Sequence, residues 1–85
     1  MSEPESRIEP DVTVDSRGAT CPGPLMDLIG KVKSADEGTV FELLTSDSSS
    51  SHDVPEWVDE ADHELLDVVE HDEEGYWTIY VEKTE

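Results

Sequence analysis

Residues 12–24 read Val-Thr-Val-Asp-Ser-Arg-Gly-Ala-Thr-Cys-Pro-Gly-Pro, and they lead directly into an apolar repeat. Val12 and Val14 alternate with polar residues, which is typical of a half-buried β-strand. The apolar side chains that follow have the spacing of one face of an amphipathic helix. They are Leu25, Met26, Leu28, Ile29 and Val32. This stretch therefore predicts a strand, a turn and a helix, in that order.

The expected start of this helix is Pro22. Proline is favoured in a first helical turn, because its missing N–H would have no partner there and its φ already suits the helix. Cys21 then lies at or next to the N-cap, facing unpaired N–H groups and the positive end of the helix dipole, which favour a thiolate. Pro24 offers no N–H, so the expected donors are Gly23 and Leu25, and Gly23 allows close approach of another backbone.

Cys21 is the only cysteine of the chain. One cysteine cannot close an intramolecular disulfide, and one thiol is too few ligands for a structural zinc site. Two interpretations remain: a buried side chain that acts as a small apolar residue, or an accessible reactive thiol. The predicted place at a helix start favours the reactive thiol.

Residues 15–24 resemble the signature of the TusA/SirA-like sulfur carrier family, in which a strand ends in an Asp-x-x-Gly turn and leads into a Cys-Pro-x-Pro helix start. Asp53-Val54-Pro55 is similar to the Asp-Ile-Pro opening of that family's second helix. The resemblance covers residues 11–83. It implies a sulfur carrier that holds sulfane sulfur as a persulfide on Cys21. It also implies that Pro22 and Pro24 fix the backbone conformation around that residue.

The resemblance also implies the partners of such a carrier. They are a cysteine desulfurase or rhodanese-type donor and a downstream acceptor protein, on a route to tRNA thiolation, cofactor synthesis or sulfur metabolism. No local histidine is placed as a general base and no cofactor loop is recognisable, so a complete catalytic site of the protein's own is hard to assemble. The alternatives from other classes are a redox-sensing or regulatory interaction domain with Cys21 as its thiol, and a structural module with Cys21 buried.

Three further residues of the motif have expected roles. Asp15, a short acidic side chain at a strand end, is expected to cap the turn. Gly18 is expected to adopt the backbone conformation that the turn requires. Arg17 is the basic residue closest to Cys21 in sequence. It either helps hold a thiolate or persulfide anion, or is a solvated surface arginine. Lys31 and Lys33 are expected to complement the negative pole of the helix.

The rest of the chain predicts three more strands and a second helix. Apolar residues at 40–44, 65–69 and 77–81 indicate the strands, and Val54, Trp57, Val58 and Ala61 share a helix face. Serines 48–51 and Asp53 are N-cap candidates before Pro55, and Glu73-Glu74-Gly75 predicts a hairpin turn. The expected fold is a two-layer α/β sandwich, β-α-β-α-β-β, in which two helices cover one face of a four-stranded mixed sheet. Both crossovers imply parallel neighbouring strands, and the last hairpin implies an antiparallel pair.

Charge is the second unusual feature of this 85-residue chain, which has 23 acidic and 5 basic residues and a formal net charge of −18. This balance argues against direct nucleic-acid binding. Such acidity is found in disordered segments and also in folded domains of a saline cytoplasm, where salt screens self-repulsion. The apolar periodicity favours the folded domain, so we expect a halophilic host.

The remaining expectations concern the ends, the compartment and the ligands. Residues 1–10 are expected to form a flexible acidic leader and residues 11–85 a single domain. No stretch of 18 apolar residues exists and the N-terminus is acidic and polar, so we expect a cytoplasmic monomer without membrane insertion. His52, His63 and His71 lack the spacing of a helical metal pair, and we expect neither a metal nor a cofactor.

Overall fold

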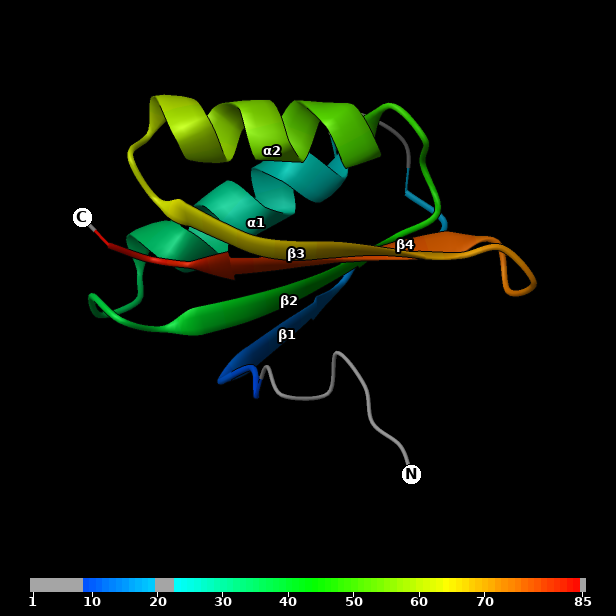
Figure 1. Ribbon diagram of the computed structural model, residues 1–85. Coiled ribbons are helices and arrows are strands. Elements are labelled where there is room, and N and C mark those ends of the chain that lie inside the picture. Colours follow the sequence, from blue (N-terminus) through cyan, green and yellow to red (C-terminus); the bar gives the residue numbers. More distant parts are fainter. Residues whose placement is uncertain (1–8, 20–22, 85) are drawn as a thin grey trace.

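The computed structural model describes residues 9–19 and 23–84. Figure 1 shows the predicted order of elements, β-α-β-α-β-β. The elements are β1 (Val12–Asp15), α1 (Gly23–Lys33), β2 (Val40–Thr45), α2 (Ser50–Glu60), β3 (Glu64–His71) and β4 (Tyr76–Glu82). Cys21, Pro22 and most of the predicted leader lie outside the described residues.

The four strands form one mixed sheet in the order β1-β2-β4-β3, and both helices lie on the same side of it (Figure 1). β1 and β2 are parallel, and β4 is antiparallel to both of its neighbours. The two-layer sandwich and the mixed sheet were therefore correctly predicted. None of the described helices is long and apolar enough to cross a membrane.

The second crossover was wrongly expected to join neighbouring strands, because β4 lies between β2 and β3. The hairpin turn predicted at Glu73-Glu74-Gly75 is present and spans residues 72–75, with Gly75 at a φ of 79°. This hairpin requires β4 to pair with β3. It does not determine whether β4 lies between β2 and β3 or at the outer edge of the sheet. In the central position Ile79 and Val81 of β4 are fully buried, whereas Leu65 and Val68 of the edge strand β3 are 39% and 37% exposed. Burial of the more continuously apolar strand explains the order.

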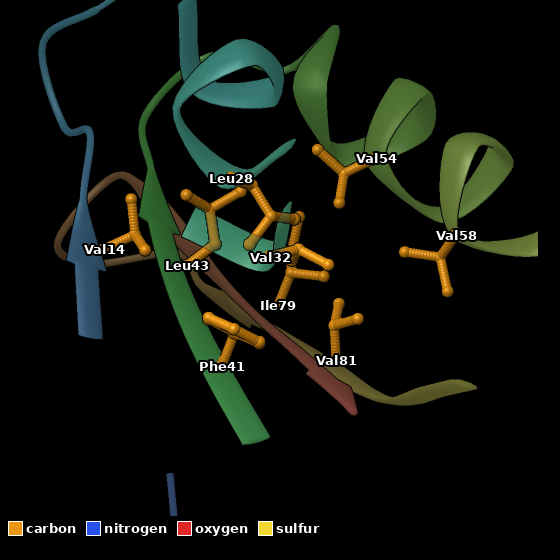
Figure 2. Close-up of a cluster of buried hydrophobic side chains, with 9 residues drawn as sticks. All are labelled: Val14, Leu28, Val32, Phe41, Leu43, Val54, Val58, Ile79 and Val81. Atoms are coloured by element: carbon orange, nitrogen blue, oxygen red, sulfur yellow. The ribbon is translucent and has the colours of Figure 1, made fainter. Parts of the chain in front are cut away.

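Among the described residues, nine buried apolar side chains form the core between the sheet and the helices (Figure 2). They are Val14, Leu28, Val32, Phe41, Leu43, Val54, Val58, Ile79 and Val81. Strand pairing aligns them in rows: Val14 is paired with Leu43, and Leu43 with Ile79. Since paired residues share a face of the sheet, these rows turn one apolar side toward α1 and α2.

Helix α1 buries Pro24, Leu28 and Val32, but Met26, which was expected on the same face, is 59% exposed. A helix turns about 100° per residue, so Met26 lies about 160° around the axis from Leu28. Leu25 and Met26 could not both face the core. Met26 is therefore available on the surface of α1.

Helix α2 begins at Ser50, five residues before Pro55, within the run of serines that the sequence offered as N-cap candidates. The N-cap is Ser49, but its side chain makes no capping hydrogen bond. Instead, the Asp47 carboxylate accepts hydrogen bonds from the backbone N–H of Ser50 (3.3 Å) and from its hydroxyl (3.0 Å). Asp47 supplies the acceptor that the first turn needs, which explains why the helix can begin upstream of the proline.

The C-terminal end of α1 is capped by the side chain of Lys83, a residue that follows β4. Its Nζ donates hydrogen bonds to the carbonyl oxygens of Val32 (2.8 Å) and Ala35 (2.7 Å). Lys31 and Lys33 were expected to complement this negative helix pole; they do lie in the last turn. The direct contact with the carbonyl oxygens at this helix end, however, comes from a residue about fifty positions later in the chain. A cation at this place adds a second donor to the Val32 carbonyl oxygen, which also accepts from the Ala35 N–H (3.2 Å), and it interacts favourably with the helix dipole.

We expect the substitution Lys83→Met to lower the free energy of unfolding by about 1–2 kcal/mol, because it removes two charge-assisted hydrogen bonds at a helix end. Lys31→Met is the matched control, since Lys31 lies in the last turn of α1 and its ammonium group makes no such hydrogen bond to any described residue. Its expected effect is below about 0.5 kcal/mol. Urea unfolding at constant salt measures both, and equal losses in the two variants would show that Lys83 acts only through its charge.

Candidate functional site

The segment between β1 and α1 begins with a tight turn. The Ala19 N–H donates to the Ser16 carbonyl oxygen (3.1 Å), and Gly18 has a φ of 92°. A positive φ at the third position is what a type II turn requires, and glycine adopts it without strain. The Gly18 N–H also donates to the Ser46 hydroxyl (2.9 Å). Gly18 therefore has the conformational role that the sequence predicted for it.

Asp15 and Arg17 are joined across this turn. The Asp15 carboxylate accepts from the Arg17 backbone N–H (3.2 Å) and from Nε (2.9 Å) and Nη2 (2.8 Å) of its guanidinium. The guanidinium also lies over the Tyr76 ring, 5.1 Å from its centre, within the range of a cation–π contact. Asp15 thus caps the turn as predicted, and the charge of Arg17 is already engaged by a carboxylate and a ring. The contact with the Cys21 thiolate, one of the two alternatives for Arg17, involves a residue that lies outside the described residues.

The hydrogen bonds from Arg17 lower the pKa of Asp15 from 3.8 to about 2. A carboxylate with a lowered folded-state pKa stabilises the fold above its unfolded pKa, and this contribution is lost as the pH falls. The window is therefore between about pH 4 and pH 2. We expect an NMR titration of the Asp15 side chain to have its midpoint near 2 and to return toward 3.8 in Arg17→Gln. A midpoint unchanged by that substitution would contradict the pairing.

A second contact ties the turn to the helix. Ser16 is buried, and its hydroxyl donates to the Asp27 carboxylate (2.9 Å) in the second turn of α1. Its backbone N–H donates to the Leu44 carbonyl oxygen of β2 (2.8 Å). Sequence reasoning missed Ser16, although alternation along the strand places it on the same side as Val12 and Val14. No sequence pattern indicated a role for Asp27 or Ser46, because their hydrogen-bond partners are distant in sequence.

Beyond the undescribed residues, the chain is fixed again at the start of α1. Pro24 is fully buried. A Cβ added at Gly23 would lie 3.5 Å from the Cβ of Ala19, an ordinary van der Waals distance, so nothing in the described structure demands glycine there. Gly23 and Ala19 are therefore neighbours in space. In the chain, Asp15, Arg17, Gly18 and Ala19 come before Cys21, and Gly23 and Pro24 come after it.

Other polar side chains gather at the same end of the sheet, where β1 and β3 finish and β4 begins. A hydrogen bond joins His71 Nε2 and the Thr78 hydroxyl (2.8 Å), and the His71 ring stacks on Tyr76 with ring centres 4.3 Å apart. Tyr76 in turn contacts Arg17. Within residues 9–19 and 23–84, no group of three or more His, Cys, Asp or Glu side chains is placed to hold a metal ion. This end of the sheet therefore carries a cluster of aromatic and polar side chains that contact one another.

The fold and the described residues on either side of positions 20–22 define a class: a small α/β domain in which a β-turn at the end of β1 is followed, in the sequence, by a Cys-Pro-x-Pro motif whose last residue, Pro24, is buried in the first turn of α1. The chain matches the family described as "Sulfurtransferase TusA" over residues 12–83. It is a sulfur carrier protein of the TusA family.

Two relatives illustrate the similarity. The "Putative sulfur carrier protein" of Archaeoglobus fulgidus is 53% identical over 72 residues, which cover 85% of this chain and 96% of that protein. The "Sulfur carrier protein TusA" of Pseudomonas syringae pv. syringae is 34% identical over 83 residues, or 98% and 96% of the two chains. These relatives give no support to the expected halophilic host.

Among solved structures, the SirA-like protein of Desulfitobacterium hafniense superposes with a TM-score of 0.75. The match covers 87% of this chain and 99% of that chain, at 19% identity. At this identity the similarity establishes the fold. The resemblance drawn from residues 15–24 is therefore confirmed for both the family and the architecture.

Proposed function

We propose that this carrier accepts sulfane sulfur on Cys21 as a persulfide and relays it to an acceptor protein. The donor is a cysteine desulfurase or a rhodanese-type enzyme, and the route leads to tRNA thiolation, cofactor synthesis or sulfur metabolism. One observation carries the proposal: Cys21 is the only cysteine in a chain that belongs to a sulfur carrier family. Covalent transport of sulfane sulfur needs a thiol, and the chain has no other.

The transfer is balanced without an external oxidant. The Cys21 thiolate attacks the outer sulfur of the donor's persulfide, so that a new S–S bond forms at Cys21 and the donor's S–S bond breaks. The donor cysteine leaves as a thiolate. Relay repeats the same exchange, with the acceptor as the nucleophile. Because no group of the carrier changes oxidation state beyond this exchange, it needs neither cofactor nor metal.

The described residues support this chemistry in two ways. Cys21 precedes Gly23, the first described residue of α1, by two positions, and the positive pole of a helix favours thiolate and persulfide anions. The chain on both sides of Cys21 is fixed, by Ser16 and Gly18 before it and by Pro24 after it. A reactive thiol between two fixed chain segments can be presented to two partner proteins in turn.

We further propose that the carrier works as a cytoplasmic monomer that docks transiently on proteins, and that the acidic residues 1–10 lie outside the single domain of residues 11–85. The family match begins at residue 12, which supports this boundary. The net charge of −18 supports protein partners over nucleic acid.

The test is a two-step relay. The protein is incubated with a cysteine desulfurase and cysteine, separated from the donor, and then treated with cyanide as a chemical sulfur acceptor. We expect close to one thiocyanate per protein, released from Cys21. Absence of thiocyanate together with resistance of the folded protein to iodoacetamide at neutral pH would overturn the proposal, because it would show that the thiol is inaccessible.

A further inference from the structure

A groove of about 620 Å³ lies between the two helices, alongside the core. Its apolar lining comes from Met26, Ile29 and Val32 of α1 and from Trp57 and Ala61 of α2. Of these side chains, Met26 is 59% exposed, and Trp57 is half-buried against the core. The volume is in the range of small-molecule sites, about 300–1,000 Å³, which are lined mainly by apolar and aromatic side chains.

The charge of this groove is opposite to that of the molecule. Lys33, Lys83 and His63 complete its lining, and no acidic residue is among the lining side chains. The chain has only 5 basic residues against 23 acidic ones, so the presence of two lysines at one groove is a marked departure from the overall composition. The groove therefore combines an apolar surface with a local positive charge.

Lys33 is the group most available to a ligand. Within residues 9–19 and 23–84, the only ion pair joins Arg17 and Asp15, so no described carboxylate lies within 4.0 Å of the Lys33 ammonium group. Met26, Ile29 and Lys33 follow at i, i+3 and i+7, which places them along one stripe of α1. The ammonium group thus stands at the end of an apolar stripe.

The two other polar residues are held in place by the fold. Lys83 is fixed by its hydrogen bonds to the Val32 and Ala35 carbonyl oxygens, and its charge remains beside the groove. His63 accepts a hydrogen bond at Nδ1 from the Thr84 N–H (3.3 Å). Its neutral form then carries the ring proton on Nε2, which is left as a donor. Both groups favour an anion in the groove.

We propose that this groove binds a small amphiphilic anion, with an aliphatic or aromatic body against Met26, Ile29 and Trp57 and a carboxylate head beside Lys33. The charge distribution favours this occupant over a protein. A partner with a basic rim would meet lysines at the groove, and an acidic partner would be repelled by the rest of the surface, where the charge of −18 resides. A single anionic group on a small apolar body avoids both penalties.

Decanoate below its micelle concentration is the probe, titrated into the full-length protein at a salt concentration that screens long-range repulsion. We expect saturable NMR shifts at the Trp57 indole N–H and at the backbone amides of Met26 and Ala61. Lys33→Glu should weaken binding about tenfold, since it reverses the charge beside the head group. Lys31→Glu makes the same change on the same helix away from the groove, and should alter the affinity less than about twofold.

Decanol separates the contribution of the charge from that of the apolar body, and it should bind more weakly than decanoate to the wild type. Dispersed spectra of both glutamate variants establish that they are folded; Lys33→Gln replaces Lys33→Glu if the latter is not. Absence of saturable shifts, or equal weakening by Lys33→Glu and Lys31→Glu, would overturn the proposal.

Discussion

Alanine in place of Cys21 is expected to leave a folded protein that carries no sulfane sulfur. The chain around Cys21 is held by the Ser16–Asp27 and Gly18–Ser46 hydrogen bonds and by the buried Pro24, none of which uses the thiol. After incubation with desulfurase and cysteine, the variant should release no thiocyanate to cyanide, and its far-UV circular dichroism should match that of the wild type. Thiocyanate from Cys21→Ala would place the sulfur elsewhere.

A relocated thiol provides the matched control. Ser48 is exposed and precedes Ser50, the first residue of α2, by two positions, as Cys21 precedes Gly23 in α1. The double variant Cys21→Ala, Ser48→Cys therefore offers a surface thiol before a helix of equal length. We expect it to react with iodoacetamide but to load sulfur at least about tenfold more slowly, because donors must dock around the thiol. Equal loading would mean that any accessible thiol suffices.

Alanine in place of Phe41 is expected to remove a large part of the stability of the fold. Phe41 is fully buried in β2, between the helices and the middle of the sheet, and it is the largest of the buried side chains (Figure 2). Truncation of a buried phenylalanine costs about 3–5 kcal/mol, because it removes transfer free energy and leaves a cavity. A domain of this size is stable by only about 4–13 kcal/mol.

Urea unfolding at constant salt measures this loss, with Met26→Ala as the control. Met26 is 59% exposed, and alanine is a good helix former, so the control should stay within about 0.5 kcal/mol of the wild type. A loss below about 1.5 kcal/mol for Phe41→Ala would contradict the full burial of Phe41 in the core.

Local patterns in the sequence predicted most of the fold. Alternation at Val12 and Val14 and helical spacing at Leu28 and Val32 identified β1 and α1, because each pattern reflects burial of one face of a single element. The same rule placed Met26 wrongly, since apolar residues at i and i+1 cannot share a narrow helix face. The glycine at position 18 was predictable because a positive φ is a local demand.

Contacts between distant residues were not predictable from one sequence. Insertion of β4 between β2 and β3 depends on which strand buries more apolar surface against the helices. Capping of α1 by Lys83, and the tie between Ser46 and Gly18, join segments that no local pattern connects. The pairing of Arg17 with Asp15 could have been predicted, because the two residues are close in sequence. The contact of Arg17 with Tyr76 could not, because it joins distant segments.

The most direct test of sulfur carriage is intact-protein mass spectrometry after incubation with a cysteine desulfurase and cysteine, followed by fragmentation to locate the added mass. The account predicts a gain of about 32 Da, the mass of one sulfur atom, on the peptide that contains Cys21. This gain should be reversed by dithiothreitol and absent from Cys21→Ala. An unmodified wild type whose Cys21 still reacts readily with iodoacetamide would contradict it, because an accessible thiol would then fail to take sulfur from this donor class.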